Sequence, residues 1–171
     1  MPEELKIEIG GIIENTFDYS LPPAELDKLL SSRMKFKKSV YGLRNDDVLY
    51  LEYVMLGYAL DFIDFVGNNF NIEINFDEEN LAQYCGIMSA LQRSFAEEPP
   101  SADFFDSLLK GATGFFGIMV IKNLGGNWAP SNIGMAVIHN GTSAFVMNRV
   151  GRYLQGGGDE MSALYNVLKG V

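Results

Sequence analysis

The chain has little of the chemistry from which common active sites are built. Its 171 residues include one cysteine, Cys85, and one histidine, His139. A single cysteine excludes an intrachain disulfide and a cluster of thiolate metal ligands. A single histidine excludes the paired Glu-x-x-His motifs of helical di-iron sites. We therefore expect no metal and no cofactor.

Neither of these two residues lies in a setting that would activate it. Cys85 falls between Ala82 and Met88 in an expected helix, where no neighbouring histidine or lysine lowers the pKa of its thiol. His139 directly precedes an expected turn, and the chain has no Gly-x-Ser-x-Gly nucleophile motif. We expect neither residue to be catalytic.

Long apolar runs and an apolar leader are also missing. The most apolar stretch, 112–121, has ten residues, whereas a helix that crosses a bilayer needs about 20. The first residues, Met1 to Glu4, are acidic, and no apolar run of the kind a signal peptide needs follows them. These features predict a cytoplasmic protein with no membrane partner.

Positive charge is scarce, especially in the first half. The net charge is −9, divided into −10 for residues 1–100 and +1 for residues 101–171. A negative protein repels phosphate backbones, so nucleic-acid binding is unlikely as a general function. A basic cluster at Arg33, Lys35, Lys37 and Lys38 is interpreted as the charged C-terminal end of a helix, with an RNA contact as the alternative.

Two further patterns have an ordinary structural explanation. Asp61 and Asp64 lie three residues apart, with Glu52 nine residues before Asp61, and we interpret them as the solvated face of a helix. The glycines 156–158 precede a helix, but no Gly-Lys-Ser/Thr follows them, so we interpret them as a flexible loop and not a phosphate cradle.

What the chain does contain is an ordinary globular mixture, with 47% hydrophobic and 20% charged residues. We predict a single α+β domain over residues 1–171, with about five helices packed on a small antiparallel sheet. The first expected helix begins near Pro22-Pro23. The others are expected at 46–66, 77–96 and 102–124, in a short stretch from about Asn148, and at 159–169.

Three glycines interrupt the most apolar of these helices. Gly111, Gly114 and Gly117 recur at three-residue spacing, although each glycine costs about 1 kcal/mol relative to alanine in a helix. We expect this cost to be offset by the close approach of another backbone.

Strands are expected in three places. Alternating apolar residues mark 5–13 and 71–76, and Asn140-Gly141 between two β-prone runs predicts a hairpin over 133–147. A two-residue turn pairs Val137 with Ala144. Both faces of this hairpin are apolar, so we expect both to be covered.

One stretch resembles a known pattern. Residues 114–128 read GFFGIMVIKNLGGNW, which is similar to a signature of small uncharacterised bacterial α+β domains of unknown function. In these domains a glycine-rich apolar helix runs into Gly-Gly-x-Trp. The resemblance covers about residues 46–169. The chain departs from the family at Ile118, where the family has an acid, and at Asn75 and Asp77, where it has Asp and Ser.

The leading hypothesis for function is a protein-interaction or small-ligand binding module without catalytic activity. The partner would be a small ligand, another protein or a second copy in a homodimer. The alternative is an enzyme of unfamiliar type with a polar pocket near Trp128. In both cases the candidate contact residues are Asn127, Trp128, Arg149, Arg152 and Tyr153. A tryptophan just past a helix end usually fills the edge of a core, with ligand contact as the alternative.

Overall fold

The computed structural model describes residues 17–41, 48–131 and 134–170. Six α-helices, one 3₁₀ turn and three strands lie in these ranges. In chain order they are α2 (Pro23–Tyr41), α3 (Val48–Phe70), η1 (Glu78–Asn80), α4 (Leu81–Glu97), α5 (Ala102–Leu124), β1 (Asn127–Ser131), β2 (Gly134–His139), β3 (Thr142–Ala144), α6 (Val146–Leu154) and α7 (Met161–Lys169). The predicted α+β class and the small antiparallel sheet are confirmed.

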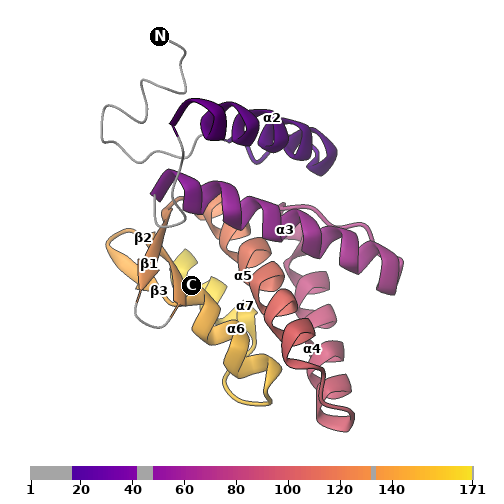
Figure 1. Ribbon diagram of the computed structural model, residues 1–171. Helices are drawn as coiled ribbons and strands as arrows, with labels where there is room; N and C mark the ends of the chain where they lie inside the picture. The colour runs from indigo at the N-terminus through magenta and orange to yellow at the C-terminus, as the bar shows by residue number, and fades with distance from the viewer. Residues whose placement is uncertain (1–16, 42–47, 132–133, 171) are drawn as a thin grey trace.

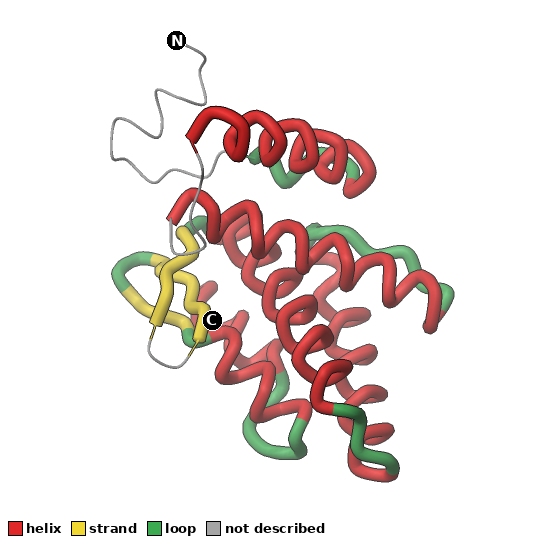
Figure 2. Tube along the Cα trace, viewed as in Figure 1, coloured by secondary structure: helices red, strands yellow, loops and turns green. Residues whose placement is uncertain are grey.

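The helices are stacked around α5 (Figures 1 and 2). Helix α2 lies over one side of α3, and the other side of α3 crosses α5 in the most extensive helix–helix contact. Helices α6 and α7 also pack on α5, and the sheet lies at its C-terminal end. Helix α4 contacts α5 through Tyr84, whose Oη donates to the carbonyl of Ala112 at 3.0 Å. Every residue from Gly111 to Ile121 is buried, so this helix forms the centre of the core.

The glycines of α5 allow the close approach that their spacing predicts. A Cβ built on Gly114 would lie 2.6 Å from the carbonyl oxygen of Met55, and one on Gly111 would lie 3.0 Å from the Cβ of Phe62. Both contacts are with α3. Gly117 has another neighbour: its Cβ would lie 2.0 Å from the ring of Trp128. Two of the glycines therefore seat α3, and the third seats the tryptophan.

The hairpin prediction is confirmed at its turn and in its register. Val137 pairs with Ala144 and His139 with Thr142, and Asn140 and Gly141 have φ angles of 49° and 74°, as a type I′ turn requires. The second strand is shorter than predicted because α6 begins at Val146, two residues before the expected start at Asn148. Strand β1, which pairs with the other edge of β2, was not predicted from the sequence.

The expected strand at 71–76 is wrong. The segment is extended, and Ile74 and Phe76 are buried as the alternation implies. However, the sheet in the described residues consists of β1, β2 and β3 alone, and this segment has no ladder partner in it. Helix α3 also continues to Phe70, past the predicted end at Val66. The expected strand at 5–13 lies outside the described residues.

Helix α5 is longer than the apolar stretch seen in the sequence. By length and composition alone, its 23 residues would suffice to cross a membrane, but 67% of its most apolar window is buried within the fold. A central helix packed on all sides has the same composition.

Candidate functional site

A cleft of about 760 Å³ lies between the start of α2, the middle of α3 and the segment that joins α3 to η1. We call it the acidic cleft, because five carboxylate side chains line it. These are Asp27, Asp61, Asp64, Glu73 and Asp77. The volume falls in the range of about 300–1,000 Å³ that is typical of small-molecule sites.

The carboxylates come from three separate parts of the chain. Asp27 is on α2, Asp61 and Asp64 are on α3, and Glu73 and Asp77 are in the segment that follows α3. Between them the cleft presents apolar side chains, including Leu21, Leu60, Ile63 and Ile74. The tertiary structure therefore combines charged and apolar groups in one cavity, and no histidine or cysteine lines it.

Most of this negative charge is not neutralised by the residues that the structure describes. Among them, Lys122 is the one basic residue that lines the cleft, and its Nζ forms an ion pair with Asp77. In the described part of the chain, Asp27, Asp61, Asp64 and Glu73 have no hydrogen-bond or ion-pair partner. Partial burial, together with the nearby charges of Asp64 and Asp27, raises the pKa of Asp61. A raised pKa at a carboxylate means that its ionised form is destabilised where it stands.

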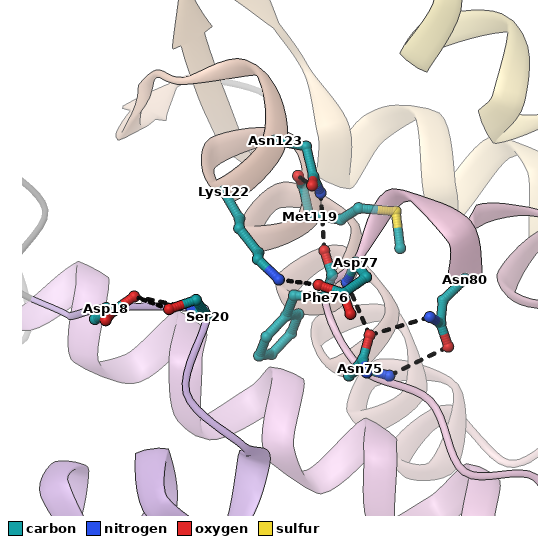
Figure 3. Close-up of polar contacts among 9 residues, drawn as sticks. All are labelled: Asp18, Ser20, Asn75, Phe76, Asp77, Asn80, Met119, Lys122 and Asn123. Carbon is teal, nitrogen blue, oxygen red and sulfur yellow. Dashed lines mark hydrogen bonds and ion pairs between the residues drawn. The ribbon is translucent and has the colours of Figure 1, made fainter.

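One wall of the cleft is held by side-chain hydrogen bonds, as Figure 3 shows. The Asn75 side-chain oxygen accepts from the backbone N–H of Asp77 at 2.9 Å and from Asn80 Nδ2 at 3.0 Å. Asn123 Nδ2 donates to the Phe76 carbonyl at 2.8 Å. Together with the Lys122–Asp77 pair, these bonds attach the segment to the C-terminal half of α5. Side chains in this way satisfy the backbone N–H of Asp77 and the carbonyl of Phe76, although the segment belongs to no sheet.

The opposite side is fixed by a buried hydrogen bond. Tyr19 Oη donates to Glu52 Oε1 at 2.9 Å, and both side chains are buried. Burial and the Glu52 charge raise the pKa of the Tyr19 hydroxyl well above its ordinary value. From the sequence, Glu52 was expected on a solvated face with Asp61 and Asp64. This is wrong for Glu52, which points into the core, whereas the two aspartates are exposed.

The five contact residues expected from the sequence do not line the acidic cleft. Trp128 is 4% exposed, its ring rests on Gly117, and its indole Nε1 has no hydrogen-bond partner among the described residues. Tyr153 is buried on α6, and its carbonyl accepts from Gln92 Nε2 at 2.7 Å.

The polar members of that set are on the surface. Asn127, Arg149 and Arg152 are exposed, and none of them lines either the acidic cleft or a second, apolar groove of about 320 Å³ beside α3. The structure therefore brings Trp128 and Tyr153 into the core and leaves the three polar side chains in solvent.

Both ring nitrogens of His139 form hydrogen bonds within the fold. Its Nδ1 lies 2.9 Å from the carbonyl oxygen of Gly125, which can only accept, so Nδ1 carries the proton. Its Nε2 lies 3.2 Å from Asn140 Nδ2 and accepts from it. The Nδ1 bond joins the hairpin to the end of α5, and the Nε2 bond lies within the hairpin turn. Cys85 is half-buried, and burial raises the pKa of its thiol.

The sequence drew attention to two of the cleft residues, Asp61 and Asp64, but not to the other carboxylates that line the cleft with them. Asp27 and Glu73 are isolated acids in the sequence, and nothing in their spacing links them to α3. The described residues contain no group of three or more His, Cys, Asp or Glu side chains placed to hold a metal ion. The carboxylates face a shared space and do not converge on a single point.

Comparison of the chain with models of protein families, with curated proteins and with solved structures finds no match. The resemblance to bacterial α+β domains thus stays a prediction. Ile118, the position at which the chain departs from that pattern, is a buried core side chain.

Proposed function

We propose that the protein is a binding module without catalytic activity, and that it takes a small organic cation in the acidic cleft. The observation that carries the proposal is the excess of carboxylates in one cavity, four of which have no cationic partner among the described residues. Charges that face each other without counter-charges are unfavourable in the free protein and become favourable when a cation is bound.

The walls define the chemistry of the ligand more closely. Carboxylates alternate with aliphatic side chains such as Leu60, Ile63 and Ile74. A chain of methylene groups that separates two or more ammonium or guanidinium groups matches both kinds of wall, because its charges meet the carboxylates while its methylenes cover apolar surface. A polyamine has this constitution.

The test is isothermal titration calorimetry with spermidine at low ionic strength. We expect a dissociation constant below about 100 μM for the wild type, and at least a tenfold weaker one for the double variant Asp61→Asn/Asp64→Asn, about 1.4 kcal/mol or more. Glutamate, which carries the opposite net charge, should give no binding.

The matched control is Glu97→Gln/Asp159→Asn, which also removes two negative charges, at exposed positions outside the cleft. It should leave the spermidine affinity unchanged. An equal loss of affinity in the control and in the cleft variant would mean that spermidine responds to the net charge of the protein. That result, or the absence of any binding to the wild type, would disprove the proposal.

A further inference from the structure

A second surface differs from the acidic cleft in composition, because it consists of phenylalanine side chains. The C-terminal part of α3, the end of α4 and the first turn of α5 contribute five rings that form a continuous chain of ring contacts. We call this group the phenylalanine surface: Phe65, Phe70, Phe95, Phe104 and Phe105.

Phe104 is the centre of this surface. Its ring centroid lies 5.9 Å from that of Phe65 on α3 and 6.2 Å from that of Phe95 on α4. Phe95 also contacts Phe105 at 6.2 Å, and Phe65 contacts Phe70 at 6.2 Å. These distances are those of ordinary aromatic pairs, so the rings support each other and present one surface.

The rings are only partly covered by the protein. Phe104 is 42% exposed and the other four are half-buried, whereas Phe62, Phe115 and Phe116 in the core are at most 1% exposed. Scattered exposed apolar residues are normal, but a contiguous aromatic group at the surface indicates an interaction site. Aromatic side chains also contribute much of the binding energy in protein interfaces.

The charge around these rings indicates what covers them. Residues 94–106, which end α4 and begin α5, include four acids and no base. These acids are Glu97, Glu98, Asp103 and Asp106. Only Asp106 has a partner in the described residues, since Lys110 lies 2.7 Å from it. The nearest preceding base along the chain is Arg93.

This negative rim discriminates between occupants. An anionic lipid surface would be repelled by it. A second copy of the same surface in a two-fold dimer would bring Glu97, Glu98 and Asp103 of one chain near those of the other, which is also unfavourable. A segment that carries apolar side chains flanked by lysine or arginine satisfies both the rings and the rim.

We propose that the phenylalanine surface binds a helix of a partner protein whose apolar face is flanked by basic residues. The ends of three helices, visible for α4 and α5 where their ends meet in Figure 1, form a platform for such a helix, and its residues at helical spacing would contact Phe65, Phe104 and Phe95 in turn. This interaction is independent of the acidic cleft, because none of the five rings lines the cleft.

The experiment uses a fluorescein-labelled helical peptide of leucine and lysine, about five helical turns long, with all leucines on one face. Fluorescence anisotropy should show binding to the full-length wild type, and Phe104→Ser should weaken it by at least about tenfold, the effect of losing a central interface residue. Glu97→Gln/Glu98→Gln should weaken binding and reduce its dependence on salt. A peptide with glutamate in place of lysine should not bind.

Two controls distinguish binding at the phenylalanine surface from non-specific hydrophobic binding and from binding at the acidic cleft. Val167→Ser removes an apolar side chain that is 70% exposed on α7 and outside the surface, and it should leave the affinity unchanged. Asp61→Asn should also leave it unchanged, so that failure here and failure of spermidine binding remain distinct. Melting temperatures of all variants establish that they fold.

Four outcomes would overturn the proposal. The first is a wild type that does not bind the peptide, and the second is an equal loss of affinity in Phe104→Ser and Val167→Ser. The third is a wild type that forms dimers by light scattering and becomes monomeric in Phe104→Ser, because the occupant would then be a second copy. Binding to phosphatidylserine vesicles that exceeds binding to the peptide would likewise assign the surface to lipid and contradict the inference.

Discussion

At the scale of single residues, two acids show how position alone decides the effect of a carboxylate on stability. Asp61 lies near two other carboxylates, and its pKa is raised by partial burial and by these charges. Glu78 accepts hydrogen bonds from Lys169 Nζ at 2.9 Å and Tyr165 Oη at 2.8 Å, and its pKa is lowered by them. Both side chains are in contact with water, yet their ionised forms have opposite effects on folding.

These shifts predict opposite responses to pH. The native state holds the Asp61 proton more tightly than the unfolded chain does, so this group contributes stability below its unfolded pKa and loses it as pH rises through the folded pKa. Asp61→Asn should therefore melt at the same or a higher temperature than the wild type at pH 7, and this difference should shrink as the solution is acidified towards the unfolded pKa of about 3.9.

Glu78→Gln is expected to change the melting temperature in the opposite direction to Asp61→Asn. The folded pKa of Glu78 is depressed, so its contribution is present above the unfolded pKa of about 4.3 and is lost as pH falls through the folded value. The variant should melt below the wild type at pH 7, and the difference should disappear in acid. Thermal unfolding followed by circular dichroism at several pH values measures both. A variant of Asp61 that melts lower than the wild type at neutral pH would contradict the assignment.

At the scale of secondary-structure elements, the crossing of α3 and α5 depends on the absence of one methyl group. In Gly114→Ala the new Cβ would lie 2.6 Å from the Met55 carbonyl oxygen and 3.0 Å from the Ala59 backbone nitrogen. Backbone atoms of a packed helix cannot move aside cheaply, so overpacking costs about 1–3 kcal/mol. This exceeds the gain in helix propensity of about 1 kcal/mol. We expect net destabilisation by about 1–2 kcal/mol in urea unfolding.

The same substitution at Gly86 is the control. Gly86 is exposed within α4, and a Cβ there meets nothing within 4 Å. Gly86→Ala should therefore stabilise the protein by up to about 1 kcal/mol through propensity alone. Effects of equal sign in the two variants would mean that α3 does not approach α5 at Gly114 as closely as described.

The contact between α5 and β1 can be followed through the single tryptophan. A Cβ on Gly117 would lie 2.0 Å from the Trp128 ring, so Gly117→Ala should push the ring out of its buried site. Indole emission moves to longer wavelength on exposure to water, and we expect this shift in the variant together with a lower melting temperature. Gly86→Ala should emit as the wild type does. An unchanged emission maximum in Gly117→Ala would contradict the packing of Trp128 on α5.

At the scale of the whole molecule, uncompensated negative charge is the dominant electrostatic feature. The net charge is −9, and the structure concentrates part of it in the acidic cleft and part at the rim of the phenylalanine surface. Repulsion of this kind opposes the compact state and is screened by salt, because the Debye length falls from about 30 Å at 0.01 M to about 8 Å at 0.15 M.

We therefore expect sodium chloride to raise the melting temperature of the wild type over this range. The increase should be smaller in Asp61→Asn/Asp64→Asn, which removes two of the repelling charges, than in Glu97→Gln/Asp159→Asn, which removes as many at positions outside the cleft. Differential scanning calorimetry provides the measurement. A melting temperature that falls with added sodium chloride would show that favourable ion pairs outweigh the repulsion.

The sequence by itself determined the features that depend on neighbouring residues. Helical spacing of apolar residues located α2 to α5, and Asn140-Gly141 set the hairpin turn and its register. Turn geometry and helix periodicity are local properties, so a few residues suffice to specify them. The glycine spacing in α5 even predicted a close contact, although not its partner.

Only the tertiary structure decided the features that join distant residues. The alternation at Ile74 and Phe76 correctly indicated buried side chains, but a strand also needs a neighbouring strand, and here Asn123 of α5 donates to the Phe76 carbonyl in its place. The same holds for charge. Asp27, Asp61 and Glu73 are separate acids in the chain and line one cavity in the fold, because electrostatic interaction depends on distance in space and not on separation in sequence.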